Sequence, residues 1–143
     1  MPCTRQRGWS LVELLIVLAI ITIMMAFAIP YFQGAVMDTT ETAAMQAIHT
    51  IHTAEVQYFA QNNHFAPSLR DLAGKFNTTE LAAGQKGGYK FSVEETPTGY
   101  AIHAEPMKCG VNGKRSFYSD DTMIMRQAKC PALATAESEE IKK

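Results

Sequence analysis

A single carboxylate stands at the edge of the longest apolar stretch of the chain. Glu13 precedes residues 14–37, which contain no charged side chain. An ionisable group beside a segment of this kind is costly to bury, so Glu13 is a functional candidate by default. The spacing of Ser10 and Glu13 also allows a capping box, in which both side chains satisfy free amides at a helix start. The two interpretations are compatible.

Two further groups of side chains have the types that bind metals. His49 and His52 are three residues apart on a predicted helix, but no third donor lies near them, so we expect a solvated face and no metal site. Residues 119–122 (Ser-Asp-Asp-Thr) offer oxygens that calcium could use, yet their spacing favours a simple turn. We recognise no catalytic triad, phosphate-binding loop or pair of catalytic acids, and therefore expect neither an enzyme nor a cofactor.

The apolar stretch is long enough to cross a membrane. A helix from Trp9 to Pro30 would span roughly 33 Å, against about 30 Å for the hydrocarbon core of a bilayer. Arg5 and Arg7 precede it, so the positive-inside rule places the N-terminus in the cytoplasm and the remainder outside. A cleaved secretory signal fits poorly, because residues 27–32 (Phe-Ala-Ile-Pro-Tyr-Phe) lack the small-residue pattern of its cleavage site.

Length and charge limit the remaining possibilities. The chain has 143 residues and a formal net charge of −1, with 19% charged residues. This length favours one domain. The near-neutral charge argues against a nucleic-acid-binding protein, which normally carries a basic excess.

A helical pattern continues beyond the apolar stretch. Apolar residues recur at steps of three and four: Ala44, Ala47, Ile48, Ile51, Ala54 and Tyr58. Most polar residues, Glu41 and His52 among them, are assigned to the opposite face. Neither Gly nor Pro occurs between Ala35 and Ala66, so we predict one helix over residues 10–62, bent near Pro30.

The remaining residues predict a small antiparallel sheet. Strands are expected at residues 89–94, 100–105, 115–119 and 123–126, separated by turns. Residues 134–143 have little pattern and are expected to fray. The predicted fold class is α+β: a long N-terminal helix, transmembrane in its first half and amphipathic in its second, packed on an antiparallel β-meander.

The N-terminal motif resembles a known family. Residues 8–21 (Gly-Trp-Ser-Leu-Val-Glu-Leu-Leu-Ile-Val-Leu-Ala-Ile-Ile) closely resemble the class III signal of the type IV pilin and type II secretion pseudopilin superfamily. The resemblance implies the pilin fold, cleavage after Gly8 by a prepilin peptidase, and N-methylation of Trp9. It also implies that Glu13 pairs with the N-terminal amine of a neighbouring subunit and that Pro30 bends the helix. Trp9 departs from the pattern, since the family usually has Phe there.

The resemblance extends more weakly into the rest of the chain. Residues 58–72 and 113–118 are similar to the corresponding segments of bacterial pilins and major pseudopilins. The implied organisation is a leader at 1–8, a long helix at 9–62 that forms the membrane or filament core, and a globular α+β head at 63–143.

The cysteines can be interpreted through the implied processing. Removal of the leader removes Cys3 and leaves Cys109 and Cys130 in an oxidising compartment, where a disulfide is the default. Two free buried thiols are the alternative. Zinc is not expected, because neither cysteine has a second Cys or a His close by in sequence.

The family implies two functions for such a chain. The first is a structural subunit of a bacterial type IV pilus, and the alternative is the major pseudopilin of a type II protein secretion system. Cys109 with Cys130, and the lack of a matching calcium loop, favour the pilus. A monomeric membrane-anchored binding protein is a third hypothesis, from a different class.

The resemblance also implies partners and a location. The partners are further copies of the chain in a helical filament, the prepilin peptidase and methylase, an inner-membrane assembly platform with its ATPase, and membrane lipid before assembly; nucleic acid is not expected. The chain would cross the inner membrane once, with a cytoplasmic N-terminus and a periplasmic head. It would then join an extracellular pilus or a periplasmic pseudopilus.

Overall fold

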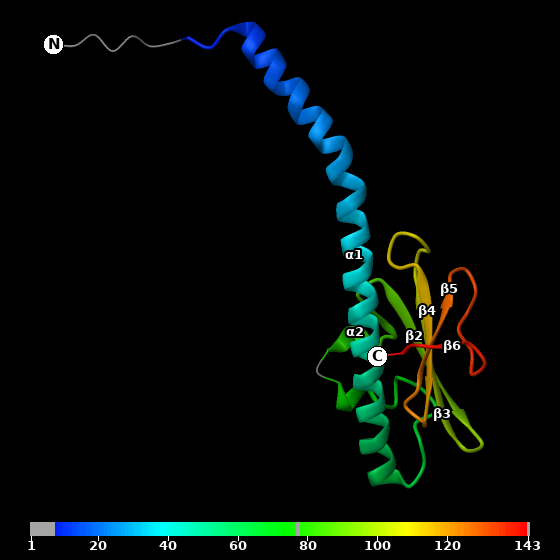
Figure 1. Cartoon of the computed structure of the whole chain (residues 1–143). Helices are drawn as coiled ribbons and strands as arrows, with labels where there is room; N and C mark the ends of the chain where they lie inside the picture. Colours follow the sequence, from blue (N-terminus) through cyan, green and yellow to red (C-terminus); the bar gives the residue numbers. More distant parts are fainter. Residues whose placement is uncertain (1–7, 77, 143) are drawn as a thin grey trace, which may run out of the picture. The chain divides into compact units, whose positions relative to one another are not determined.

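A computed structural model of the chain describes residues 8–76 and 78–142 (Figure 1). The chain divides into two compact units, residues 1–35 and 36–143. Helix α1 (Leu11–Asn62) begins in the first unit and ends in the second. The predicted long helix is confirmed, and it continues through Pro30. The bend predicted there stays a prediction.

Among the described residues, six strands form one antiparallel sheet in which each strand pairs with the next along the chain. They are β1 (Gln85–Lys86), β2 (Tyr89–Thr96), β3 (Gly99–Pro106), β4 (Arg115–Asp120), β5 (Met125–Lys129) and β6 (Glu139–Glu140). Two short helical segments, η1 (Ala73–Lys75) and α2 (Thr79–Ala82), lie between α1 and the sheet in sequence. The α+β class and the meander are confirmed.

The four predicted strands correspond to β2, β3, β4 and β5, and each is displaced or extended by one to three residues. The sequence did not predict β1 or β6, which have two residues each. The expectation that residues 134–143 fray is wrong for Glu139 and Glu140, because they pair with Gln127 and Arg126 of β5.

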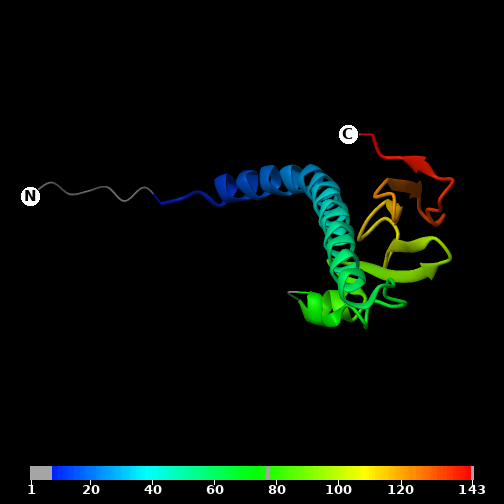
Figure 2. The same cartoon turned by 90° about the horizontal axis from the view of Figure 1, so that it is seen from below.

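The core lies between the second half of α1 and one face of the sheet (Figure 2). Alternation along the strands sends every second side chain toward the helix. The buried side chains from the two sides are Ala44, Ala47, Ile48, Ile51 and Ala54 of α1 with Tyr89, Phe91, Val93, Tyr100, Ile102, Ala104 and Phe117 of the sheet. The predicted stripe of α1 is therefore the buried face, and Tyr58 packs half-buried at its end.

The other face of the sheet is covered by the chain that follows β5. Ala134 packs against Ala101 and Tyr118 in a second, smaller cluster. Ser116 fixes this segment: its hydroxyl donates to the Ala132 carbonyl at 2.8 Å and accepts from the Ala134 N–H at 2.9 Å. A polar side chain that is 2% exposed thus has both a donor and an acceptor partner.

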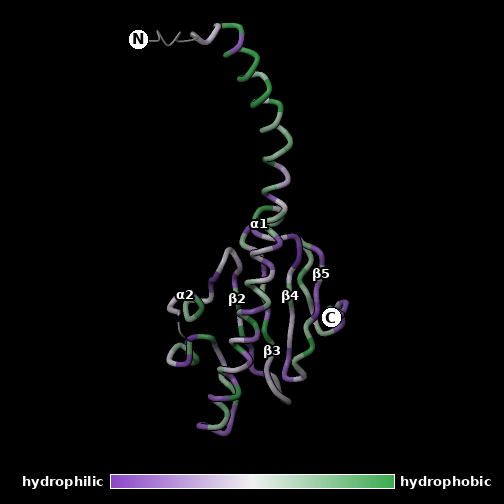
Figure 3. The backbone as a smooth tube through the Cα atoms, turned by 60° about the vertical axis from the view of Figure 1, so that its left-hand side comes forward, coloured by the Kyte–Doolittle hydropathy of each residue, from purple (hydrophilic) through white to green (hydrophobic). Residues whose placement is uncertain are grey.

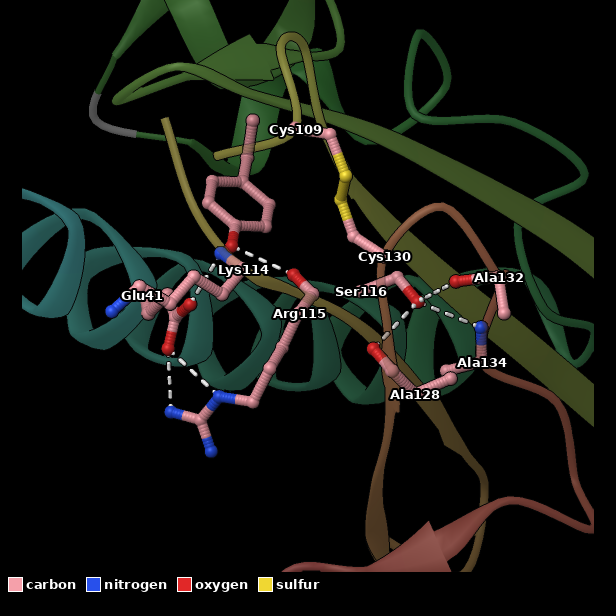
Figure 4. Close-up of a disulfide and its surroundings, with 10 residues drawn as sticks. Glu41, Cys109, Lys114, Arg115, Ser116, Ala128, Cys130, Ala132 and Ala134 are labelled. Carbon is pink, nitrogen blue, oxygen red and sulfur yellow. Dashed lines mark hydrogen bonds and ion pairs between the residues drawn. A yellow bond between two sulfur atoms is a disulfide. The ribbon is translucent and has the colours of Figure 1, made fainter. Parts of the chain in front are cut away.

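A disulfide joins the loop between β3 and β4 to the end of β5 (Figure 4). It links Cys109 to Cys130, whose Cα atoms are 6.1 Å apart. Beside it, the Tyr89 hydroxyl donates to the Arg115 carbonyl at 2.8 Å. A Cβ at Gly113 would lie 1.9 Å from the Tyr89 hydroxyl, so only glycine fits there. The predicted disulfide between Cys109 and Cys130 is thus formed in the structure.

We expect Cys130→Ser to lower the free energy of unfolding by about 3 kcal/mol, because the bond closes a loop of roughly this cost in the chain-entropy model. Chemical unfolding of the full chain in detergent micelles measures the loss. A reductant should destabilise the wild type and leave the double variant Cys109→Ser/Cys130→Ser unchanged. Peptide mapping without reductant that found both thiols open to alkylation would contradict the pairing.

Candidate assembly surface

The first half of α1 exposes nearly all of its apolar side chains. Every residue from Leu18 to Tyr31 is exposed, and the side chain of Phe27 is 75% exposed. The helix is long and apolar enough to cross a membrane, and none of its most apolar window is buried within the chain. Figure 3 shows the apolar character along this part of the helix. The surface needs a covering that the chain does not supply.

The polar groups of this half are few. The Thr22 hydroxyl bonds to the carbonyls of Leu18 and Ala19, at 2.7 and 2.9 Å. Hydrogen bonds of this kind satisfy a hydroxyl inside the helix itself. Thr22 therefore adds little cost to burial of the helix among lipid tails or other helices.

Glu13 lies in the first turn of α1 and is exposed. Among the described residues it has neither a hydrogen bond nor an ion pair, and the capping box with Ser10 is not formed. Instead the Ser10 carbonyl accepts the Leu14 N–H at 3.1 Å, as in any helix start. The carboxylate is therefore available to a partner outside the described chain, although no contact identifies that partner.

The predicted processing site lies just before α1. Gly8 and Trp9 are exposed and precede the helix, and Trp9 is 69% exposed. Residues 1–7 of the predicted leader, Cys3 included, lie outside the described residues. Cleavage and methylation remain predictions.

The second half of α1 is held to the sheet by buried polar side chains. Glu41 is 2% exposed, and its carboxylate accepts the Lys114 N–H at 2.7 Å. The Arg115 guanidinium donates to it through Nε and Nη2, at 2.8 and 2.6 Å (Figure 4). Thr40 adds a hydrogen bond to the Asn112 carbonyl. The β3–β4 loop is thereby fixed to α1 at one end of the sheet. Our assignment of Glu41 to the solvated face was wrong.

His52 is buried as well, at 3% exposed, so its assignment to a solvated face was also wrong. Its Nε2 lies 2.8 Å from Ser119 Oγ and its Nδ1 lies 2.6 Å from the Tyr100 hydroxyl. Ser119 uses its only proton on the Ile124 carbonyl, at 3.0 Å, so its oxygen must accept from His52 Nε2–H. Nδ1 then accepts from Tyr100. The neutral imidazole satisfies every group in this chain of hydrogen bonds.

Glu55 lies one helical turn beyond His52 and is fully buried. One carboxylate oxygen accepts the Ala66 N–H at 2.9 Å and the other has no partner among the described residues. Burial raises the pKa of Glu55 above its usual value, against the opposing effect of the Ala66 hydrogen bond, and Glu95 adds to the rise. The hydrogen bond fixes the chain just after the end of α1.

The remaining metal candidates do not come together. His49 is exposed, and His52 has both nitrogens engaged. No group of three or more potential metal ligands is found within residues 8–76 and 78–142. Asp120 accepts the Thr122 N–H at 3.1 Å and bonds to the Thr122 hydroxyl, so this segment forms a turn, as expected.

The spacing of residues on α1 places two acids in line with its apolar stripe. Glu41, Ala44, Ile48, Ile51 and Glu55 are separated by alternating steps of three and four residues. Both acids therefore belong to the buried stripe by position, and only its polar type assigned Glu41 elsewhere. A polar residue at a stripe position therefore indicates a specific hydrogen-bond partner elsewhere in the head.

Comparison with known proteins identifies the N-terminal segment. Residues 3–29 match the family model of the prokaryotic N-terminal methylation motif. The chain therefore carries this motif at its N-terminal end. It is 31% identical over 88 residues to the type IV major pilin protein PilA of Myxococcus xanthus, covering 62% of this chain and 38% of that protein. It is 32% identical over 91 residues to a fimbrial protein of Neisseria meningitidis serogroup A, covering 64% and 51%.

A third relative, a fimbrial protein of Pseudomonas aeruginosa, is 43% identical over 49 residues, or 34% of this chain and 32% of that protein. The matches therefore span about half or less of the length of these relatives. No solved structure matches the chain significantly. The N-terminal motif, the relatives and the α+β fold together support the type IV pilin superfamily.

The stability of this pilin-like head should depend on pH through His52. Burial, with a smaller effect of His49 and against that of Asp120, lowers the pKa of His52 from 6.5 to about 4. The unfolded chain takes up this proton near pH 6.5 and the folded chain only near pH 4. Stability is therefore full above pH 6.5 and falls by about 3 kcal/mol as the pH drops toward 4.

Chemical unfolding of the full chain in micelles, between pH 4 and pH 7.5, measures this effect against His52→Gln. Glu55 titrates in both proteins, so its contribution cancels in their difference. His49→Gln, which removes an exposed histidine, should retain the pH dependence. Parallel pH profiles for the wild type and His52→Gln would contradict the prediction.

Proposed function

We propose that the mature chain is a structural subunit of a type IV pilus, with no catalytic role. The observation that carries this proposal is the exposed apolar half of α1, which follows Glu13 and is continuous with a head that buries its own core. The printed names of the relatives, a major pilin and fimbrial proteins, support it. The single anchor helix supports insertion in a membrane before assembly.

The energetics favour two alternative coverings for this helix. More than ten large apolar side chains between Leu11 and Ile29 are exposed. Burying each is worth about 1.5–3 kcal/mol, so the surface represents on the order of tens of kcal/mol. Lipid covers it in the membrane and other copies of the helix cover it in a filament. Exchange of lipid for other helices changes the free energy of this surface little, so burial alone does not drive a copy out of the membrane. A platform protein and its ATPase would supply the work of extraction.

Processing prepares the N-terminus for this exchange. We propose cleavage after Gly8 on the cytoplasmic face by a prepilin peptidase, followed by N-methylation of Trp9. The exposure of both residues ahead of α1 supports access for these enzymes. The head then lies on the periplasmic side until assembly, and in the finished pilus it lies outside the cell.

Glu13 would set the register between subunits. A carboxylate in an apolar surrounding requires a positive partner, and the Trp9 amine of a neighbouring copy becomes available after cleavage. Because a buried ion pair contributes more to specificity than to stability, the pair would form at one axial step between copies and would exclude others.

We expect surface filaments that contain the chain, beginning with N-methyl-Trp9. Electron microscopy of intact native cells shows whether the filaments are present, and intact-mass measurement of the sheared filaments identifies the terminus. A mature terminus beyond Ile29 would overturn the processing step. Filaments confined to the periplasm would instead support a type II secretion pseudopilin.

Glu13→Ala should be inserted and cleaved as the wild type but should not assemble into filaments. Glu13→Asp, which retains the charge on a shorter side chain, is the matched control and should assemble in part. A cap at the helix start alone would cost only about 1 kcal/mol and leave assembly intact. Normal filament numbers from the Glu13→Ala strain would therefore reject the register role.

A further inference from the structure

The two ends of the sheet carry charges of opposite sign. The basic end comprises the β1–β2 turn, the β3–β4 loop and the end of β5, with Lys86, Lys108, Lys114 and Lys129. The acidic end comprises the β2–β3 hairpin and the β4–β5 turn, with Glu94, Glu95, Asp120 and Asp121. The strand pairing fixes this segregation, since Lys86 is opposite Tyr89 at the start of β2 and Lys129 is opposite Arg115 at the start of β4.

None of these eight side chains forms an ion pair with another described residue, and the acid within the sheet at the basic end, Glu105 of β3, is opposite Lys90 of β2. The ion pair found among residues 8–76 and 78–142 is Glu41 with Arg115, and it includes none of the eight. Asp38, Glu80 and Glu139 line pockets beside the lysines without pairing with them. Arg126 is one residue inside the acidic end, where it donates to the Ser138 carbonyl. Six of the eight residues are within loops or at strand ends, and six are exposed.

The charge separation runs along α1. The basic end is beside Glu41, which accepts the Lys114 N–H. The acidic end is beside His52, which bonds to Tyr100 and Ser119, the residues next to the hairpin and the turn. At about 1.5 Å per residue, Glu41 and His52 are roughly 16 Å apart along the helix.

We propose that the acidic end of one copy contacts the basic end of the next copy along the filament. This inference rests on the proposed function. Copies that insert through the same N-terminal segment have parallel helices, so a shift along the helix axis brings unlike ends together. Each copy then contacts one neighbour along the filament through its acidic end and the other neighbour through its basic end. Such a contact does not close on itself and generates a helical array.

The contact would select the register more than it would add affinity. Exposed ion pairs are individually weak because water and salt screen them. Complementary charges do raise association rates and disfavour wrong alignments. The head contact would therefore act together with the apolar helices, which supply most of the buried surface.

Charge reversal at each end, alone and combined, tests this contact in cells that make the full chain. The acidic-end variant is Glu94→Lys/Glu95→Lys, and the basic-end variant is Lys108→Glu/Lys129→Glu. All four side chains are exposed. We expect each variant to reduce the yield of sheared filaments roughly tenfold. The combined four-residue variant restores complementarity and should return the yield to within about twofold of the wild type.

Glu80→Lys/Glu139→Lys is the matched control, because it makes the same charge change on exposed residues that lie beside lysines of the basic end and not at the acidic end, and it should assemble normally. Protease resistance and the intact disulfide confirm that each variant is folded. The milder variant Glu94→Gln/Glu95→Gln removes the charges without reversing them and should show a smaller loss of filament yield. It replaces the acidic-end reversal variant if that variant does not fold.

Three outcomes would overturn the head contact. The first is normal filament yield from both one-end variants. The second is a loss at one end that the combined variant does not restore, as expected if the basic end binds anionic lipid instead. The third is an equal loss in the control. Absence of filaments from the wild type would contradict the proposed function itself. This result differs from the three above, in which the wild type assembles.

Discussion

The apolar half of α1 is the constraint on which the rest of the structure depends. Its side chains are exposed along more than four helical turns, and no other part of the described chain covers them. Exposure of this surface to water is unfavourable, so this half of the helix needs an apolar covering, and the proposed function supplies it as membrane lipid and then as other copies. The sparse polar groups are compatible with both: Thr22 is satisfied within the helix, and Glu13 is at its start.

The second half of the same helix is instead buried within the chain on one face. It supplies one side of the head's core, and polar contacts fix its position along the sheet. Glu41 binds the β3–β4 loop, His52 bonds to β3 and β4, and Glu55 holds the chain just after the helix end. An apolar stripe alone tolerates sliding by a turn, whereas three buried hydrogen-bonded side chains do not. The head can therefore be displaced only together with the helix.

The sequence predicted much of this fold because its strongest patterns are local. The uncharged run before Asp38, the alternation at residues 89–94 and the Ala-rich stripe of α1 each depend on neighbouring residues. The buried roles of Glu41 and His52 depend on partners more than 45 residues away in β3 and β4, so residue type alone misassigned both. Two-residue strands such as β6 are too short to display alternation.

The brevity of the outermost strands matters wherever many heads are held close together. An unpaired strand edge is a template for another sheet, and prolonged contact between parallel chains is the condition under which cross-β aggregates nucleate. Here β1 and β6 have two residues each, and Lys86, Glu139 and Glu140 add charge to these edges. These two outermost strands therefore offer a neighbouring head little backbone to extend, which disfavours cross-β contact wherever heads are crowded.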